Sequence, residues 1–317
     1  MRPLLYILSF RAVNRIQSFP FSANSLPRTM STSVNANKNS VLYNFWRGHP
    51  NNELLPAKEM QKILEHMASP TNQDRLKTSL QYLSSDRGDP ALLKEISLFF
   101  RRHTLNDEIP QDAYTAPTIA DAAGDLSQEI DMFLTHGVSH GIDMLCTSQT
   151  VPGDVVMIER PSYFLAAGIF RSHGLKVQSL PMKRQFVDGS YEGALMFDVD
   201  AFAQGLKDGS IETPRMIYIV PTHQNPTAST MPTADRWKLC QLARQFGFLV
   251  AADEVYHLLD WRDDKSQRPA RFSILDHILS KQSGSSTADS SAGLGGERRT
   301  GCSVSINSFT KIFTPYV

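Results

Sequence analysis

The chain has 317 residues, which is enough for one large α/β domain or for one and a half domains. Its 32 Lys and Arg residues balance its 32 Asp and Glu residues, so the net charge of zero provides no field to attract nucleic acid or an anionic membrane. Three widely spaced cysteines without a CxxC pair argue against disulfide and zinc frameworks and fit a reducing compartment, and no apolar run is long enough to span a bilayer.

Residues 1–40 have the composition of a targeting segment. Several basic residues precede the first acidic residue, Glu53, and apolar residues from Leu5 to Ile16 recur at helical spacing. A basic, Ser-rich, amphipathic and acid-free segment is typical of a mitochondrial transit peptide. The alternative is an unstructured extension, with Met30 as a second start that would give a cytosolic form. We therefore expect residues 1–40 to be a leader outside the fold, and the protein to be mitochondrial or cytoplasmic.

Residues 41–80 are predicted to form an N-terminal arm and a helix. The segment 41–55 is aromatic and then rich in turn residues, which suits an arm lying on a surface. The segment 56–67 places its apolar residues at helical spacing. A further helix is predicted to begin at Pro90, because proline suits the first turn, and to run through Phe100.

The segment that follows predicts a seat for an anion. Residues 133–135 resemble a strand, Gly137 and Gly141 bracket Val-Ser-His, and an apolar helix follows. A helix start leaves backbone N–H groups pointing outward, and the helix dipole adds positive potential, so a phosphate would be stabilised there. Strand-to-helix turns also contain glycine for packing alone, so this signal is weak without others.

Short apolar strands alternate with helices over the rest of the chain. The predicted strands cover 155–158, 177–180 and 216–220, one begins at Phe248 and ends in Asp253 and Glu254, and one leads from Ser303 to Lys311; the predicted helices cover 198–208 and 235–246. This alternation indicates an α/β fold with a doubly wound, mostly parallel sheet, which we place in residues 81–317. Residues 280–301 are Ser/Gly-rich and of low complexity, so we expect a flexible insertion that loops out between two strands.

Reactive and polar side chains gather where these strands end. Asn225 follows one strand, Asp253 ends the next, Tyr256 comes shortly after it, and Lys311 ends the last strand. Tyr163 follows the strand at 155–158, where an aromatic ring stacks on a planar ligand or simply packs. Ligands of such sheets bind at the carboxyl ends of the strands, so these residues are expected to share one site.

One cofactor needs all of these groups. A lysine amine condenses with an aldehyde, and a carboxylate keeps a pyridine nitrogen protonated so that the ring accepts electrons. An opposite charge in contact shifts the pKa of a buried group by about 1–3 units, which is enough for that purpose. An asparagine and a tyrosine can donate to the ring oxygen, while an aromatic side chain stacks on the ring. Together these requirements describe pyridoxal 5′-phosphate.

The chain resembles the class I/II aminotransferases of fold type I from about Tyr43 to Pro315. Within them it is similar to the aromatic and 2-aminoadipate aminotransferase-like proteins of fungi. The segments that carry the resemblance are NFWRGHPNNELLP, HGVSHGIDML, PGDVVMIERPSYF, PTHQNPTAST, ADEVY and SFTK. Any one of them is a weak match, and six in the family's order are a strong one.

The resemblance implies a role for each site residue. Lys311 would attach the cofactor covalently, and Asp253 would bind the pyridine nitrogen. The other implied contacts are those of Asn225 and Tyr256 with the ring oxygen, of Tyr163 with the ring face, and of Ser139, His140 and Ser308 with the phosphate. The resemblance also implies a homodimer in the full-length form, with an amino acid and a 2-oxo acid as substrates.

The sequence departs from the family pattern at two places. After QNPT the family has glycine, whereas this chain has Ala228, so we expect an altered turn there. The family continues beyond the lysine with a Pro-Gly-Leu-Arg stretch and a small C-terminal domain, whereas this sequence stops at Val317. We therefore expect an incomplete large domain that lacks the small domain and two arginines, one for the phosphate and one for the substrate carboxylate.

The expected activity is transamination between an amino acid and a 2-oxo acid. One alternative is a truncated isoform that is weakly active or non-catalytic, or that pairs with a complete subunit. Another is a different reaction of the same cofactor, such as β-elimination, because the electron-accepting ring is common to both. A regulator would need a DNA-binding module ahead of the domain, and the leader shows no helix-turn-helix pattern.

Overall fold

The computed structural model describes residues 52–82, 85–104, 132–185, 194–261, 267–284 and 301–312. The chain divides into two units, residues 1–53 and 54–317, and only Asn52 and Glu53 of the first are described. The predicted leader and most of the predicted arm therefore lie outside the described residues. Among the described residues, no helix combines the length and the apolar character needed to cross a membrane.

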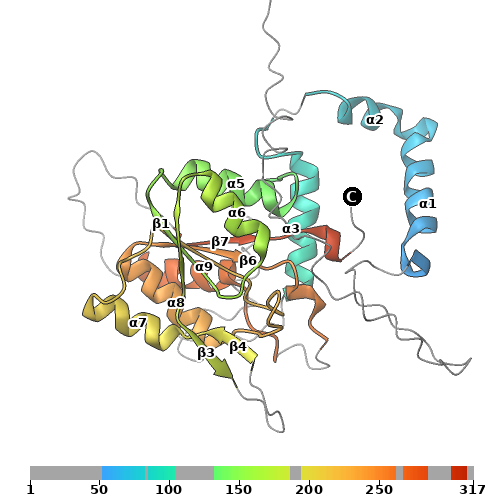
Figure 1. Ribbon diagram of the computed structural model, residues 1–317. Helices are drawn as coiled ribbons and strands as arrows, with labels where there is room; N and C mark the ends of the chain where they lie inside the picture. Colours follow the sequence, from blue (N-terminus) through green and yellow to red (C-terminus); the bar gives the residue numbers. More distant parts are fainter. Residues whose placement is uncertain are drawn as a thin grey trace, which may run out of the picture. The chain divides into compact units, whose positions relative to one another are not determined.

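A five-stranded parallel sheet forms the centre of the second unit (Figure 1). Its strands, in spatial order, are β2 (Lys176–Ser179), β1 (Val155–Ile158), β5 (Met216–Ile219), β6 (Leu249–Asp253) and β7 (Ser303–Ile306). All four pairings between neighbours are parallel. The predicted α/β fold with a mostly parallel sheet is thus confirmed. The strand order reverses its direction between β1 and β5, which is where such sheets bind ligands.

Helices cover both faces of this sheet (Figure 1). On one face lie α5 (Gly137–Gln149) and α6 (Phe164–Ser172). On the other face lie α7 (Val199–Asp208), α8 (Thr233–Phe246) and α9 (Phe272–Gly284). The boundaries of α7 follow from local chemistry: the Asp198 carboxylate accepts from the backbone N–H of Asp200 and Ala201, and Gly209 ends the helix with φ of 78°.

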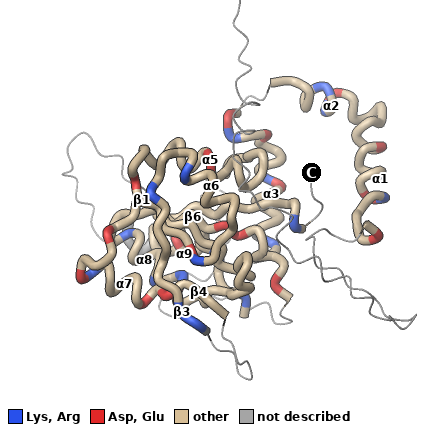
Figure 2. Tube along the Cα trace, viewed as in Figure 1, with Lys and Arg blue, Asp and Glu red and all other residues tan. Residues whose placement is uncertain are grey.

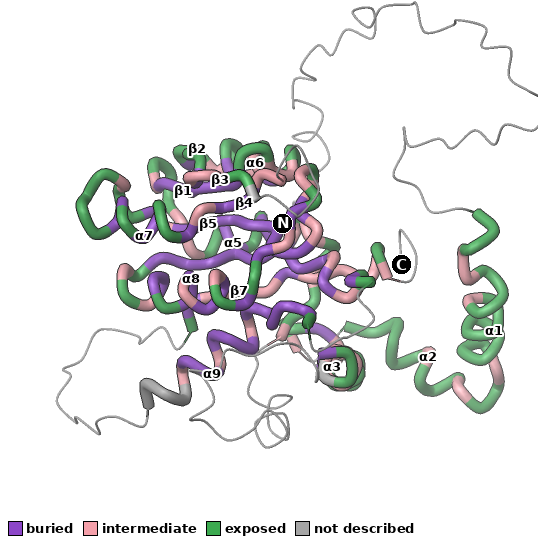
Figure 3. Tube along the Cα trace, turned by 90° about the horizontal axis from the view of Figure 1, so that it is seen from below, coloured by how far each residue is buried: buried purple, intermediate pink, exposed green. Residues whose placement is uncertain are grey.

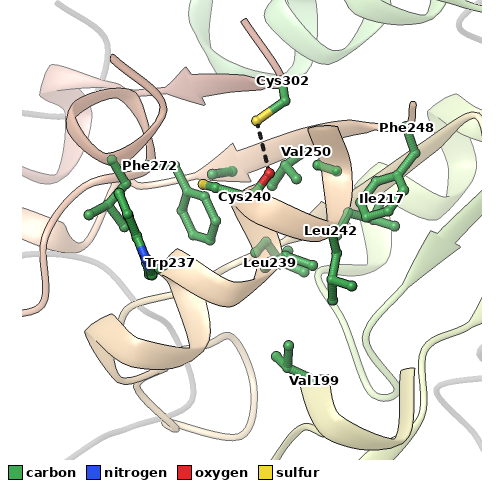
Figure 4. Packing of buried hydrophobic residues seen from close by; sticks show 14 of the residues in the cluster. Val199, Ile217, Trp237, Leu239, Cys240, Leu242, Phe248, Val250, Phe272 and Cys302 are labelled. Atoms are coloured by element: carbon green, nitrogen blue, oxygen red, sulfur yellow. Dashed lines mark hydrogen bonds between the residues drawn. The ribbon is translucent and has the colours of Figure 1, made fainter. Parts of the chain in front are cut away.

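The three central strands are almost wholly apolar because both of their faces are covered, whereas the outer strands β2 and β7 carry polar residues. β1, β5 and β6 are buried along their whole length, and successive residues point to opposite faces. Ile217 and Val250 therefore join the cluster under α8, whereas Met216 and Tyr218 join the cluster under α5 and α6. Figure 3 shows buried residues along the central strands and exposed residues on the helices α6 and α7, whereas the described residues of α9 are buried or half-buried. Figure 4 shows the cluster under α8, where the Cys302 thiol donates to the carbonyl oxygen of Cys240 at 3.5 Å.

The N-terminal helices precede the sheet in sequence. They are η2 (Asn52–Leu54), α1 (Ala57–Ala68), η3 (Pro70–Asn72), α2 (Gln73–Ser79) and α3 (Pro90–Thr104). The predicted helices at 56–67 and from Pro90 are confirmed within a few residues. No residue of α1 or α2 is buried, and the apolar residues Ile63, Leu64 and Met67 of α1 are exposed.

The structure differs from the sequence-based expectations in four segments. Residues 133–135 form no strand, because only the Leu134 N–H finds a backbone partner, the carbonyl of Arg87 at 2.8 Å. An antiparallel pair, β3 (Met182–Gln185) and β4 (Ala194–Phe197), was not predicted. The first five residues expected in the insertion belong to α9, which runs to Gly284, and residues 285–300 lie outside the described part. The last strand ends at Ile306 and a short helix, η7 (Phe309–Lys311), carries the lysine.

Candidate active site

Three neighbouring parallel strands deliver the candidate residues to one edge of the sheet. Asp253 is the last residue of β6, Asn225 follows β5, and Lys311 follows β7. Because β5 pairs with β6 and β6 pairs with β7, the segments after these strands leave the sheet side by side. The sequence-based expectation that these side chains share one site is therefore consistent with the topology.

Asp253 is a buried carboxylate with one open oxygen. Asp253 is 4% exposed, and its Oδ2 accepts a hydrogen bond from the Tyr218 hydroxyl at 2.6 Å. Its Oδ1 is buried and has no hydrogen-bond partner among the described residues. Burial raises the pKa of Asp253 to about 6. The Tyr218 hydroxyl, the backbone N–H of Val255 and the charge of Lys311 oppose that rise in pKa, and the charge of Glu254 adds to it. A buried acceptor of this kind suits a donor supplied by a ligand.

Lys311 is exposed in the folded chain. Its Nζ is 5.8 Å from the centre of the Tyr256 ring, and its positive charge lowers the pKa of Asp253. Ser308 caps the short helix that carries it, and the Ser308 Oγ accepts from the backbone N–H of Thr310 at 3.2 Å. This cap fixes the start of the helix that bears the amine.

Tyr256, Asn225 and Tyr163 surround the same carboxylate. Burial raises the pKa of Tyr256, a hydrogen bond with the Asn225 side chain opposes the rise, and the charge of Asp253 adds to it. Burial also raises the pKa of Tyr163, and the charge of Asp253 and Tyr256 contribute to that shift. Both rings pack against the apolar cluster under α5 and α6. The structure therefore places Tyr163, Tyr256 and Asn225 within electrostatic reach of one another around Asp253.

The first turn of α5 lies against the end of β7. A Cβ atom added to Gly141 would meet Thr135 Oγ1 at 3.5 Å and Ile306 Cγ2 at 3.7 Å, so the helix approaches the strand closely there. Ser139 and His140 belong to this first turn, and Ser308 comes two residues after Ile306. The start of a helix of 13 residues and a serine hydroxyl thus lie at the same strand end, as an anion site requires.

The ring of His140 has a fixed hydrogen-bonding role. Its Nδ1 accepts from the backbone N–H of His136 at 3.0 Å, and the two imidazole rings stack with their centres 5.3 Å apart. An imidazole that accepts at Nδ1 carries its proton at Nε2. His140 therefore supplies an Nε2–H donor at the start of α5.

A buried ionic network fixes the end of β7. Glu254 accepts from Arg271 Nε at 3.2 Å, from the Ser305 hydroxyl at 2.6 Å and from the backbone N–H of Phe272 at 3.0 Å. Arg271 also donates to the side chain of Asn307, the residue before Ser308. Its guanidinium lies 4.4 Å from the centre of the Phe100 ring, which brings in α3. This network holds the segment that leads to Lys311.

Two site residues were not predicted from the sequence. Tyr218 lies inside the apolar run of β5, where a tyrosine looks like any other core aromatic. Glu159 is the first residue after β1 and is 4% exposed, and burial raises its pKa to about 7. Its position at the carboxyl end of a buried strand is the signal that could have found it, since the same signal identified Asp253.

This arrangement can bind a flat, cationic ring that also carries an anionic group. Asp253 Oδ1 would accept from the ring cation, and the α5 start with Ser308 would bind the anion. Between them, an amine and two phenols could act on a reacting atom.

Comparison with known proteins gives one family. The family model described as aminotransferase class I and II matches residues 59–282, which is most of the chain. An uncharacterised protein of Saccharomyces cerevisiae is 24% identical over 293 residues, covering 86% of this chain and 61% of its own length. An aromatic amino acid aminotransferase of Schizosaccharomyces pombe is 30% identical over 142 residues, covering 44% of this chain and 28% of its own length. The chain thus spans less than two thirds of the length of these curated relatives.

The solved structures show the same fold. The kynurenine aminotransferase of Pyrococcus horikoshii superposes with a TM-score of 0.58 at 21% identity, covering 85% of this chain and 52% of that one.

Proposed function

Because the chain belongs to the class I and II aminotransferase family, we propose that its site carries out transamination between an amino acid and a 2-oxo acid with pyridoxal 5′-phosphate. Pyridoxal 5′-phosphate is the cofactor of this family. The observation that carries the proposal is the buried Asp253 Oδ1, which has no partner among the described residues, beside the strand end that bears Lys311. Fold alone would not suffice, since one fold serves many reactions.

The residues present fit this cofactor. A protonated pyridine nitrogen would satisfy Asp253 Oδ1, and its positive charge would counter the burial that raises the pKa of the carboxyl. Ser139, His140 and Ser308 would bind the phosphate, because they lie at the start of α5 and beyond β7. Asn225 and Tyr256 would contact the ring oxygen, and Tyr163 would pack on the ring face.

Each residue then has one task in the reaction. When bound, the cofactor supplies an aldehyde and a ring that accepts electrons from the substrate. Asp253 would hold the proton on the ring nitrogen, and the Tyr218 hydroxyl at 2.6 Å would fix the orientation of that carboxylate. Lys311 would attach the cofactor and, once released, would move the proton at the α-carbon of the substrate. Tyr256 and Asn225 would orient the ring through its oxygen.

The test uses the purified chain and its Lys311→Ala variant. We expect the chain to develop a visible absorption band with pyridoxal 5′-phosphate, and the band to bleach with an amino acid and return with 2-oxoglutarate. The Lys311→Ala variant should lose the covalent band and the turnover. A variant that keeps both would overturn the proposal. Transfer of the amino group to 2-oxoglutarate, measured as glutamate, distinguishes transamination from β-elimination, which releases ammonia instead.

A further inference from the structure

Glu159 is a buried carboxyl for which the proposed reaction has no use. Its Oε2 accepts from the backbone N–H of Val220 at 2.9 Å and lies 3.4 Å from Nε2 of Gln224. Val220 follows β5, so Glu159 joins the ends of two neighbouring strands, β1 and β5. Burying a carboxyl costs free energy unless the group makes specific hydrogen bonds. The role of Glu159 should therefore lie in the groups that it holds through these two contacts.

Gln224 is the centre of the loop that follows β5. It is 2% exposed, its Nε2 donates to the carbonyl of Pro161 at 2.8 Å, and its Oε1 accepts from the backbone N–H of Thr227 at 2.7 Å. Its backbone N–H donates to the carbonyl of Ser229 at 2.8 Å. The side chain therefore ties the loop both to itself and to the segment after β1 that contains Glu159.

The same loop contains two strained residues. His223 has φ of 46° and Ala228 has φ of 59°, and both values lie in the left-handed region that favours glycine. Residues persist in that region only when their surroundings hold them there. Gln224, which is hydrogen-bonded to Glu159 and Pro161, lies between these two residues in the sequence.

We propose that Glu159 is a positioning residue whose carboxyl fixes the loop 221–231 through Val220 and Gln224, and so sets where the Asn225 side chain lies. Asn225 is the next residue after Gln224, and its side chain bonds to Tyr256. The effect of Glu159 on the cofactor rests on the proposed function, in which Asn225 contacts the ring oxygen. The effect of Glu159 on the conformation of residues 221–231 does not depend on that function.

The first experiment needs no cofactor. Hydrogen exchange of the full chain is compared with that of Glu159→Leu and Gln224→Leu, with exposed matched controls Glu212→Leu and Gln204→Leu. We expect amides within 221–231 to exchange about fivefold faster in the two test variants, since each loses hydrogen bonds of ordinary strength. Amides of β5 and β6 and both controls should stay as in the parent chain. Unchanged exchange within 221–231 in both test variants would overturn the proposal.

The second experiment measures the pH midpoint of the visible absorption of the bound cofactor, with Asn225→Ala as the reference. Loss of the Asn225 donor would leave more negative charge on the ring oxygen of the bound cofactor. The proton on the nitrogen beside that oxygen would then be held more tightly, so the pH midpoint of the absorption change would rise. Gln224→Leu, which removes no charge, should raise it in the same direction, by about half a unit or less. A purely structural role would lower the melting temperature of Gln224→Leu and leave the midpoint unchanged, which contradicts the proposal.

The two possible failures are separable. If the parent chain forms no visible band with pyridoxal 5′-phosphate, the proposed function fails, while the hydrogen-exchange result still decides the role of Glu159. If the band forms and only Asn225→Ala shifts its midpoint, the positioning role fails and the proposed function stands.

Discussion

Asp253 owes its properties to what surrounds it and not to its residue type. An aspartate at the end of an exposed strand would be ionised and solvated, whereas this one is buried with one oxygen bonded to Tyr218 and one open. Burial favours the protonated form until a cation arrives. The site is therefore prepared for a positively charged ring nitrogen, and the affinity for such a ring should increase as pH rises through the pKa of this carboxyl.

The raised pKa values of Asp253 and Glu159 predict how stability depends on pH. Their ordinary values are 3.8 and 4.5, and in the folded chain they are about 6 and about 7. Between the two sets of values the folded chain binds more protons than the unfolded chain, so the free energy of unfolding falls as pH rises. Each group contributes a loss on the order of 3 kcal/mol once pH has passed its folded pKa.

Urea unfolding of the chain without cofactor at pH 5 and pH 7.5 measures this dependence. The Asp253→Asn variant should show a smaller fall than the parent chain, because its side chain takes up no proton. Parallel curves for the two proteins would contradict the raised pKa of Asp253.

The loop after β5 shows how an element can tolerate an unfavourable residue. Ala228 stands where the family pattern has glycine, and its φ of 59° is the conformation that glycine adopts most easily. Its backbone N–H donates to the carbonyl of Gln224 at 2.6 Å, which closes the turn. The turn thus keeps a left-handed residue in spite of the side chain.

Replacing this alanine should therefore stabilise the protein. The Ala228→Gly variant is expected to raise the free energy of unfolding by about 0.5–1 kcal/mol, because relief of the left-handed strain exceeds the entropy that glycine adds to the unfolded chain. Denaturant unfolding measures the change. The matched control, Ala167→Gly in the middle of α6, should lower stability by about 1 kcal/mol. A loss of stability in both variants would show that residue 228 is not strained.

At the scale of the whole molecule, contacts between distant segments set the site. Arg271 joins β6, β7 and α3 through Glu254, Asn307 and Phe100. Most other charges lie on the surface, where Figure 2 shows acidic and basic residues interspersed along the chain. The predicted leader at residues 1–40 and the predicted dimer stay predictions.

Removing the charge of Arg271 tests the importance of this network. The Arg271→Met variant removes the nearer of two buried cations beside Glu254 and leaves Arg236 at 3.9 Å, so we expect a loss of about 1.5–3 kcal/mol in the free energy of unfolding. The Lys238→Met variant removes the exposed partner of Asp200 and should leave the unfolding midpoint close to that of the parent chain. Equal effects of the two substitutions, measured by denaturant unfolding, would contradict a structural role for the Arg271 network.

The sequence by itself predicted the central strands and several of the helices. Unbroken apolar runs predicted β1, β5 and β6 within a residue or two, because a strand buried on both faces needs no polar positions. The same runs predicted that Asp253 ends one strand and that Asn225 follows another, whereas Lys311 lies in a short helix beyond β7. The segment at 133–135 was predicted wrongly because an apolar triplet forms a strand only if a neighbouring strand is present to pair with it.

Only the tertiary structure decided which of these groups meet. The Tyr218 hydroxyl reaches Asp253 across 35 positions of sequence, and Glu159 reaches Val220 across 61. Local periodicity carries no information about such pairs, because they depend on the spatial order of the strands and on which face each residue occupies. Strand order follows from how the whole chain buries its apolar surface, and this is why Tyr218 and Glu159 became visible as site residues only in the folded protein.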